Sequence, residues 1–357
     1  MRICILARYP PLKGGIATHS EKLVEELAKR GHEVSVITYK KLGRKKRTVK
    51  IYEVPITDKF FLRGICYFLG SLIFLIKNMK NVDLIHAHPI HPAGTVASFF
   101  KLFSSVPLVI TSHGSDLLKW ADNPLAAKLF SRVVNSSDKL ICVSDFLAKR
   151  AEKIGIEKKK ITVVYNGVEI SSSLRKLGKK ELRKELKLPE KRKIILFVGA
   201  LNEWKRPDIL LKYSKEIDGE FIFIGEGPLE RKMKDFIMNN KLTNTRMLGP
   251  KDHETTLKFI KAADVLVIPS EYEGFGLVAL EGMALGTPVV AQPVAALKEI
   301  LTPKSLSVNL KKKIVEVLEN SRLRKEIIKE NLRIAKKFSF QKMVDEIEKV
   351  YRELYNK

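Results

Sequence analysis

Short apolar runs alternate with amphipathic stretches along nearly the whole chain, and this pattern limits the possible folds more than any other. In the first half the runs predict strands at 2–7, 33–38, 50–54, 83–87, 107–111, 139–143 and 161–164. In the stretch 16–30, Ile16, Leu23, Val24 and Leu27 recur at helical spacing. Strands that alternate with helices are typical of βαβ units, so the sequence predicts parallel sheets covered by helices.

The alternation is interrupted by a polar segment of roughly 170–192, which is rich in Ser and Lys and contains Pro189. It restarts with strands predicted at 194–198, 221–224, 245–248, 265–268 and 288–290, and a helical tail from about 310. A chain of 357 residues also exceeds the usual span of one hydrophobic core. We therefore predict two doubly wound α/β domains, over 1–170 and 193–337, with a linker at 171–192 and a last helix at 338–357.

Residues 60–76 form the most apolar stretch of the chain. At 17 residues with Arg63 inside, this run is marginal for spanning a bilayer. Its position before the strand predicted at 83–87 suits the crossover helix that a parallel sheet requires. We expect a buried or interfacial helix.

The formal charge of +26 favours phosphate-rich ligands, nucleic acid or anionic lipid headgroups as partners. Basic residues concentrate at 40–47 and at 175–193, where ten Lys or Arg stand against three Glu. Neither run contains the interleaved aromatic residues that single-stranded nucleic acid would stack on. A solvated face explains either run equally well. Among charged partners, an anionic membrane surface fits better than nucleic acid.

Composition also bears on the compartment. The cysteines Cys4, Cys66 and Cys142 are odd in number, far apart and in no CxxC pair, which favours free thiols over a metal or redox site. The N-terminus runs directly into a predicted strand and contains no signal-peptide apolar region. We expect a cytoplasmic protein.

Three loops that follow predicted strands contain candidate ligand-binding residues. Gly14 and Gly15 lie at a strand-to-helix turn, where backbone N–H groups can approach a phosphate, although a tight turn alone explains the pair equally well. His113, in the run Thr111–Asp116, stands at the carboxyl end of a strand, where ligands of open α/β sheets bind; a structural His in the loop is the alternative. Lys205, beside Arg206, would supply positive charge to a diphosphate.

The most informative segment is Ser270–Glu281, which follows the strand at 265–268 and leads into a predicted helix. Gly274 and Gly276 would let the backbone come close to a ligand at the helix N-terminus. In a continuous helix, Glu273 and Glu281 would share a face about 12 Å apart. That distance suits the two ends of an extended ligand and exceeds the ~5–9.5 Å between the paired carboxylates of a glycoside hydrolase.

Taken together, these segments resemble those of glycosyltransferase family 4, whose members share the GT-B fold of two facing Rossmann-like domains. The motifs match in order: GGI at 14–16, HGSD at 113–116, VSDF at 143–146, YNGV at 165–168, GxxxxxK at 199–205, GEGP at 225–228 and EGFGLVALE at 273–281. The similarity extends to the segment 338–354, which in this family usually forms a helix that returns to the first domain.

The resemblance implies a retaining transferase that uses a nucleoside-diphosphate sugar and usually no divalent metal, because basic residues and helix N-termini stabilise the leaving group. It implies that Glu281 bonds the ribose and that Glu273 contacts the donor sugar. It also implies that the backbone of Phe275, Gly276 and Leu277 meets the sugar and phosphates. Lys205 would neutralise the diphosphate, Gly15 would approach it from the other domain, and His113 would bond the transferred sugar.

Two departures from the family pattern stand out. Ala200 occupies a position where many members have Arg, and Arg206 is the candidate substitute for that cation. Gln292–Ala296 replaces a frequent Asp followed by a Gly-Gly turn. We expect sugar transfer to a lipid-linked or glycan acceptor at the cytoplasmic face of the membrane. The alternatives are a nucleotide-sugar epimerase on the same scaffold and a non-catalytic nucleotide-sugar-binding subunit.

Overall fold

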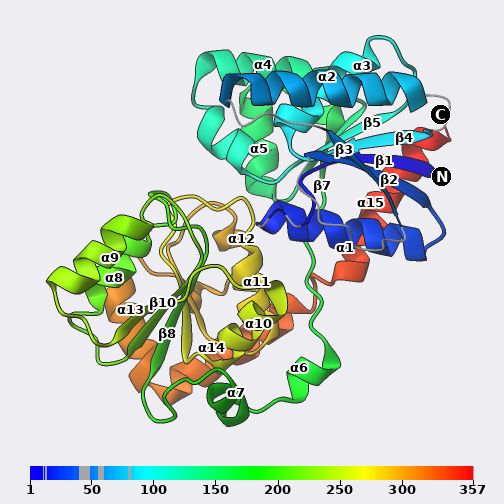
Figure 1. Ribbon diagram of the computed structural model, residues 1–357. Coiled ribbons are helices and arrows are strands. Elements are labelled where there is room, and N and C mark those ends of the chain that lie inside the picture. Colours follow the sequence, from blue (N-terminus) through cyan, green and yellow to red (C-terminus); the bar gives the residue numbers. More distant parts are fainter. Residues whose placement is uncertain (11, 13, 40–48, 55–59, 79–81, 357) are drawn as a thin grey trace. The chain divides into compact units, whose positions relative to one another are not determined.

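The computed structural model divides the chain into two compact units, and it describes all residues except 11, 13, 40–48, 55–59, 79–81 and 357. The first unit contains Met1–Tyr165 and Gln341–Lys357, and the second contains Asn166–Phe340. The basic run expected at 40–47 lies outside the described residues. Each unit is built on its own parallel sheet (Figure 1).

The sheet of the first unit has seven parallel strands in the order β3-β2-β1-β4-β5-β6-β7. The strands are β1 (Arg2–Leu6), β2 (Glu33–Tyr39), β3 (Lys50–Val54), β4 (Leu84–Ala87), β5 (Leu108–Ser112), β6 (Lys139–Cys142) and β7 (Ile161–Val163). The helices are α1 (Gly15–Lys29), α2 (Phe60–Asn78), α3 (Thr95–Lys101), α4 (Pro124–Asn135), α5 (Asp145–Lys153) and α15 (Phe340–Tyr355). Every residue of β4 and β5 is buried, as expected for a parallel sheet covered on both faces.

The helices of this unit cover opposite faces of its sheet. Figure 1 shows α2, α3 and α4 along one side, and α1 and α15 along the other. The last helix is fixed by ionic contacts to the end of α1, because Arg30 binds Asp345 at 2.6 Å and Glu348 at 2.8 Å. Its Tyr351 hydroxyl lies 2.6 Å from His86 Nδ1 of β4, inside the core.

The sheet of the second unit has five parallel strands in the order β10-β9-β8-β11-β12. These are β8 (Ile194–Val198), β9 (Glu220–Ile224), β10 (Thr245–Met247), β11 (Val265–Ile268) and β12 (Val289–Ala291). The helices are α6 (Ser172–Lys176), α7 (Lys179–Glu185), α8 (Pro207–Tyr213), α9 (Glu230–Asn239), α10 (His253–Ala262), α11 (Leu277–Ala284), α12 (Leu297–Ile300), α13 (Leu310–Glu319) and α14 (Ser321–Ala335). Both sheets confirm the expected doubly wound α/β class.

The segment 171–192, which we expected as a linker, belongs to the second unit and forms α6 and α7. Arg183 of α7 is buried and binds Asp264 at 2.6 Å, and Leu182 is fully buried. The high density of Lys and Arg concealed this anchoring, because Arg183 looks like its solvated neighbours in the sequence. The expectation of a separate linker is therefore wrong.

Helix α2 spans the apolar stretch at 60–76, where the sequence predicted a helix. Within the described residues, no helix combines the length and the apolar character needed to cross a bilayer. All three cysteines are free thiols, as the sequence predicted, and Cys4 and Cys142 are buried.

Candidate functional site

Both sheets have a topological switch point, where connections leave the sheet in opposite directions. In the first unit it lies between β1 and β4, and in the second between β8 and β11. Ligands of open α/β sheets bind outside the carboxyl ends of the strands at such points. The loops with the predicted site residues follow β1, β5, β8 and β11, and three of these strands flank a switch point.

In the second unit the loops after β8 and β11 bring Lys205 and Glu273 together. The Lys205 Nζ lies 2.5 Å from a Glu273 carboxylate oxygen, and the Ser270 hydroxyl donates to the same oxygen at 2.9 Å. The backbone also joins the loops, because the Glu271 N–H donates to the Trp204 carbonyl at 2.8 Å. The side chain of Lys205 is 26% exposed and that of Glu273 is 11% exposed, so the pair stands at the edge of solvent.

The loop before α11 corrects one prediction. We expected one continuous helix from Glu273 to Glu281, but α11 begins at Leu277 and Glu273 lies in the loop. The reason is Gly276, whose left-handed backbone (φ 93°) ends the loop and caps the helix. A Cβ at Gly276 would lie 2.6 Å from Leu297 Cδ2, so the position is closed to a side chain as well. The separation of about 12 Å, which assumed a continuous helix, no longer applies.

The segment from Phe275 to Leu277 therefore presents backbone at the N-terminus of α11. The Phe275 ring is buried and lies 5.9 Å from the Phe338 ring, centroid to centroid. This packing holds the loop against the interior of the second unit. The first N–H groups of a helix lack intrahelical partners and favour anions, so the turn can hold negatively charged oxygens.

Glu281 lies within α11 and is buried at 8% exposure. One of its carboxylate oxygens lies 2.7 Å from His253 Nε2, at the start of α10. Asp252 caps α10 by accepting from the Thr255 N–H at 2.9 Å, which fixes the turn that holds His253. The sequence points to Glu281, but it gives no sign that His253 is its partner.

Arg206 is engaged away from the Lys205–Glu273 pair. Its guanidinium binds Glu271 and also Asp208, the latter at 3.2 Å. These hydrogen bonds, led by the one to Asp208, raise the pKa of Arg206. The residue also lines a cavity of about 370 Å³ beside α8 and α9. Arg206 is thus a cation already matched by two carboxylates, which weakens the idea that it replaces the Arg that many family members have at position 200.

In the first unit Gly14 and Gly15 lie at the N-terminus of α1. Gly14 caps the helix with φ 123°, a conformation that favours glycine. A Cβ at either position would meet nothing within 4 Å. The turn therefore leaves open space in front of the first N–H groups of α1, where an anion can bind.

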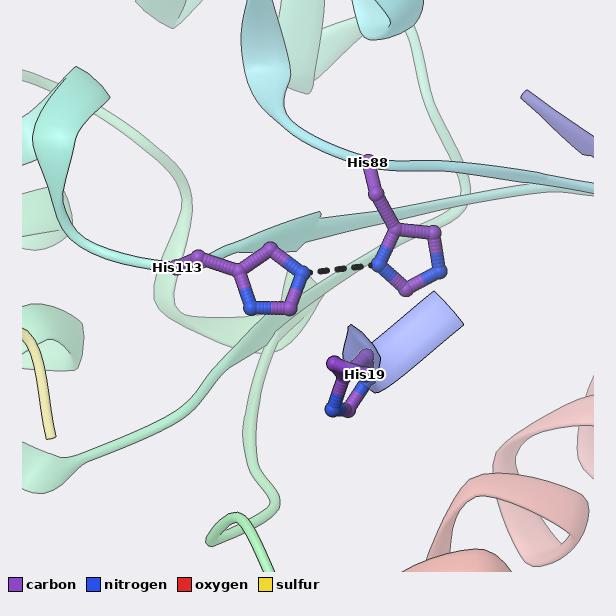
Figure 2. Close-up of side chains that lie close together, drawn as sticks. All are labelled: His19, His88 and His113. Carbon is purple, nitrogen blue, oxygen red and sulfur yellow. Dashed lines mark hydrogen bonds between the residues drawn. The ribbon is translucent and has the colours of Figure 1, made fainter. Parts of the chain in front are cut away.

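His113 is part of a group of imidazoles that the strand order assembles. It follows β5, His88 follows β4, and His19 belongs to α1. Figure 2 shows the His113 and His88 rings meeting at a hydrogen bond, with His19 beside them. His113 Nε2 lies 2.8 Å from His88 Nδ1, and the His19 and His113 rings are 4.8 Å apart, centroid to centroid.

Burial keeps these imidazoles neutral. It lowers the pKa of His19 to about 4, with a smaller contribution from the nearby positive charge of Lys22. Burial also lowers the pKa values of His88 and His113 well below the ordinary value, and the neighbouring histidines add to the effect. A neutral His113 can donate or accept a hydrogen bond, so it suits contact with sugar hydroxyl groups.

Imidazole is also a common metal ligand, so the spacing of the three side chains matters. One nitrogen from each lies within 4.8 Å of the others. Nitrogen ligands about 2.0–2.1 Å from a tetrahedral zinc ion would lie roughly 3.4 Å apart. The 2.8 Å contact is shorter than that spacing, so His88 and His113 are joined here by a hydrogen bond.

Asp116, in the same motif as His113, holds the loop in place. Its buried carboxylate accepts from the Ser112 hydroxyl at 2.7 Å and from the Ile90 N–H at 3.1 Å. Burial raises its pKa, and these hydrogen bonds oppose the rise. The carboxylate thereby joins the loop after β5 to the segment after β4, which fixes His113 against His88.

Sequence reasoning missed His19 and His88. His88 stands just past the carboxyl end of β4, so the rule that selected His113 also selects His88. His19 carried no such signal, because it lies inside α1 and looks like one polar residue of an amphipathic helix.

Comparisons with known proteins complete the description. The model of Glycosyltransferase Family 4 matches residues 13–172, and the model of Glycosyl transferases group 1 matches residues 178–334. An uncharacterised glycosyltransferase of Methanocaldococcus jannaschii is 35% identical, over 99% of each chain. Sucrose-phosphate synthase from Thermosynechococcus elongatus superimposes with a TM-score of 0.87 at 20% identity, over 99% of each chain. The Anabaena protein HepE, solved in complex with UDP-glucose, has a TM-score of 0.81 at 17% identity, over 99% of this chain and 100% of that one.

Proposed function

The chain belongs to glycosyltransferase family 4 and has the GT-B fold, and from this premise we propose a transfer reaction. The enzyme moves a hexose-type sugar from a nucleoside-diphosphate sugar to a lipid-linked or glycan acceptor, with retention of configuration at the anomeric carbon. The observation that supports the donor most directly is the Lys205–Glu273 pair at a switch point, next to the N-terminus of α11. The HepE structure with UDP-glucose supports the same class of donor.

Each side chain receives a role from its place. Lys205 and the α11 N-terminus balance the charge that develops on the leaving diphosphate, and such preorganised positive charge is a large part of catalysis. Glu273, held by Lys205 and Ser270, contacts the donor sugar. The buried carboxylate of Glu281 accepts from the ribose hydroxyls.

The roles assigned in the first unit follow the family resemblance. His113, neutral and held by His88, bonds the transferred sugar, and the open turn at Gly14 and Gly15 accommodates the diphosphate. Lys205 supplies positive charge and the N-termini of α1 and α11 supply N–H donors, so we propose that transfer needs no added divalent cation.

We propose that the acceptor stands at the inner face of the cell membrane, where a cytoplasmic enzyme meets lipid-linked acceptors. The formal charge of +26 suits an anionic surface. The apolar helix α2 suits an interface between protein and lipid.

A mixed-micelle assay tests the reaction. Radiolabelled UDP-, GDP- and ADP-sugars are offered with polyprenyl-phosphate and diacylglycerol acceptors, with and without a chelator. We expect transfer from at least one donor, equal in both buffers, and a product whose anomeric configuration by NMR matches that of the donor. The absence of transfer from every donor would overturn the proposal.

The same material separates the two alternatives. Conversion of the free donor to its epimer without acceptor would identify an epimerase. A donor that raises the melting temperature, as ligands of the native state do, without turnover on any acceptor would identify a binding subunit.

A further inference from the structure

Helix α2 is apolar on both of its sides, although only one side packs on the protein. Its inner side buries Tyr67, Ser71 and Leu75, which recur every fourth residue. Its outer side presents large apolar residues that are each 46–55% exposed, namely Leu62, Ile65, Leu69, Ile73 and Ile76. An α-helix that is apolar all round normally has both sides covered.

The exposed stripe continues onto the neighbouring helices. Phe68 of α2 contacts Phe99 of α3 edge to face, with ring centroids 5.4 Å apart. Phe99 is 41% exposed, and Leu102 and Phe103 at the end of α3 are 66% and 68% exposed. Next to α3, α4 exposes Leu125 and Leu129, and all three helices lie along the same side of the sheet (Figure 1).

The charges on these helices have one sign. The sequences of α2, α3 and α4 contain Lys and Arg, among them Lys77, Lys101, Lys128 and Arg132, and contain neither Asp nor Glu. Lys77 and Lys128 are exposed. Lys101, in contrast, is paired with Asp138 at 2.7 Å. An apolar surface of this extent marks an interaction site, and its unmixed positive charge complements an anionic partner.

We propose that the outer face of α2, α3 and α4 is the surface through which the protein lies on an anionic lipid membrane. This inference rests on the proposed function for its purpose, since it identifies how the enzyme reaches a membrane-bound acceptor. Helices with an apolar face and flanking basic residues lie in the plane of the interface with their apolar side chains among the lipid headgroups and upper acyl chains. The finding that no described helix could cross a bilayer agrees with this mode.

Vesicle flotation tests the surface with the full chain. The probe is vesicles of phosphatidylcholine with or without phosphatidylglycerol, at low and high salt, and without donor. We expect the protein to float with the phosphatidylglycerol vesicles at low salt and to bind less at high salt, because salt screens the basic residues.

Two sets of variants separate the apolar and the charged contributions. The triple variant Ile65→Ser, Leu69→Ser, Ile73→Ser should lower the partition coefficient about tenfold or more, since each serine removes apolar area from the interface. Lys77→Glu with Lys128→Glu should lower binding to anionic vesicles about tenfold while leaving binding to neutral vesicles unchanged. The matched control is Met238→Ser with Val308→Ser, two exposed apolar residues of the second unit, which should bind as the parent does.

The readouts also distinguish failure of this surface from failure of the proposed function. Circular dichroism confirms that the triple variant is folded, and transfer to a water-soluble acceptor reports on the chemistry. Binding to vesicles without any transfer would leave the surface intact and remove the proposed function. Transfer without flotation, or a triple variant that floats like the parent, would overturn the surface. Dimers in sedimentation equilibrium that the triple variant dissociates would instead assign the face to a second copy of the chain.

Discussion

At the scale of single residues, the loops after β8 and β11 are organised by charge. Lys205 is matched by Glu273, and Arg206 is matched by Glu271 and Asp208. The two neighbouring cations therefore face different carboxylates. The sequence predicts the residue types and the loops that contain them. It does not predict which carboxylate each cation binds, because adjacent basic side chains are equivalent in a sequence.

Lys205 is the cation that we expect to act on the leaving group. Substitution Lys205→Ala should lower kcat/KM about 10²- to 10³-fold, the usual cost of removing one preorganised group that stabilises developing negative charge. Steady-state transfer rates measure it. The control is Lys329→Ala, which removes an exposed lysine of α14 and should leave the rate unchanged. A fully active Lys205→Ala protein would refute this map of the site.

The carboxylates Glu281 and Glu273 should give different kinetic signatures. Glu281→Ala removes a charged group that accepts hydrogen bonds from the ribose hydroxyls. Each such bond is worth about 1.5–3 kcal/mol, so donor affinity should fall about tenfold or more. Glu273→Ala should mainly reduce kcat, because its contact is at the reacting sugar. Calorimetric donor titration with steady-state kinetics separates the two effects. Equal changes in KM and kcat for both variants would contradict these roles.

At the scale of elements, the strand pattern was nearly complete in the sequence. All twelve predicted strands are present, with ends that differ by at most a residue or so. Short apolar runs in a parallel sheet are buried on both faces, so their limits show directly in the sequence. The start of α11 did not show, because the left-handed glycine at 276 is indistinguishable in sequence from a glycine inside a helix.

That glycine supplies a test at the same scale. Gly276→Ala forces a side chain into a left-handed backbone and against Leu297, so unfolding free energy should fall by about 2–4 kcal/mol. Gly286→Ala is the matched control. It also has a positive φ (72°), but its nearest neighbour would be 3.8 Å away, so it should cost only about 1 kcal/mol. Denaturant titration followed by circular dichroism measures both, and equal losses would show that the contact with Leu297 does not matter.

The imidazole group depends on strand order, which the sequence did not reveal. Residues 19, 88 and 113 are far apart in the chain, and they meet because β1, β4 and β5 are neighbours in the sheet. The alternation of strands and helices predicts that a parallel sheet forms, but it leaves open which strands are adjacent. His113 could therefore be placed at a strand end, whereas its partner His88 could not be assigned.

At the scale of the whole molecule, buried neutral histidines make stability depend on pH. The pKa of His19 is lowered to about 4 and that of His86 to about 3, chiefly by burial, and His88 and His113 shift in the same direction. Below pH 6.5 the unfolded chain binds protons that the native first unit excludes. The stability of the first unit is therefore highest above pH 6.5, where these histidines are neutral in both states, and it is lost as the pH falls toward 4.

We therefore expect the first unit to lose up to about 1.4 kcal/mol per pH unit for each of these histidines between pH 6.5 and 4. Calorimetric melting from pH 7.5 downward measures the slope. His19→Gln should make the slope shallower, because it removes one of the buried imidazoles. A melting temperature independent of pH in this window would contradict the neutral, buried state of the four rings.

The way the chain passes between the units has a consequence for its synthesis. The first unit is made of two pieces of chain, Met1–Tyr165 and Gln341–Lys357, whereas the second is one uninterrupted stretch. During synthesis, residues 166–340 leave the ribosome before Gln341–Lys357 do, so the second unit has all of its residues available first. The earlier-made sheet must wait for the last helix, which supplies Tyr351 to His86 and Glu348 to Arg30. The part translated first is thus the part completed last.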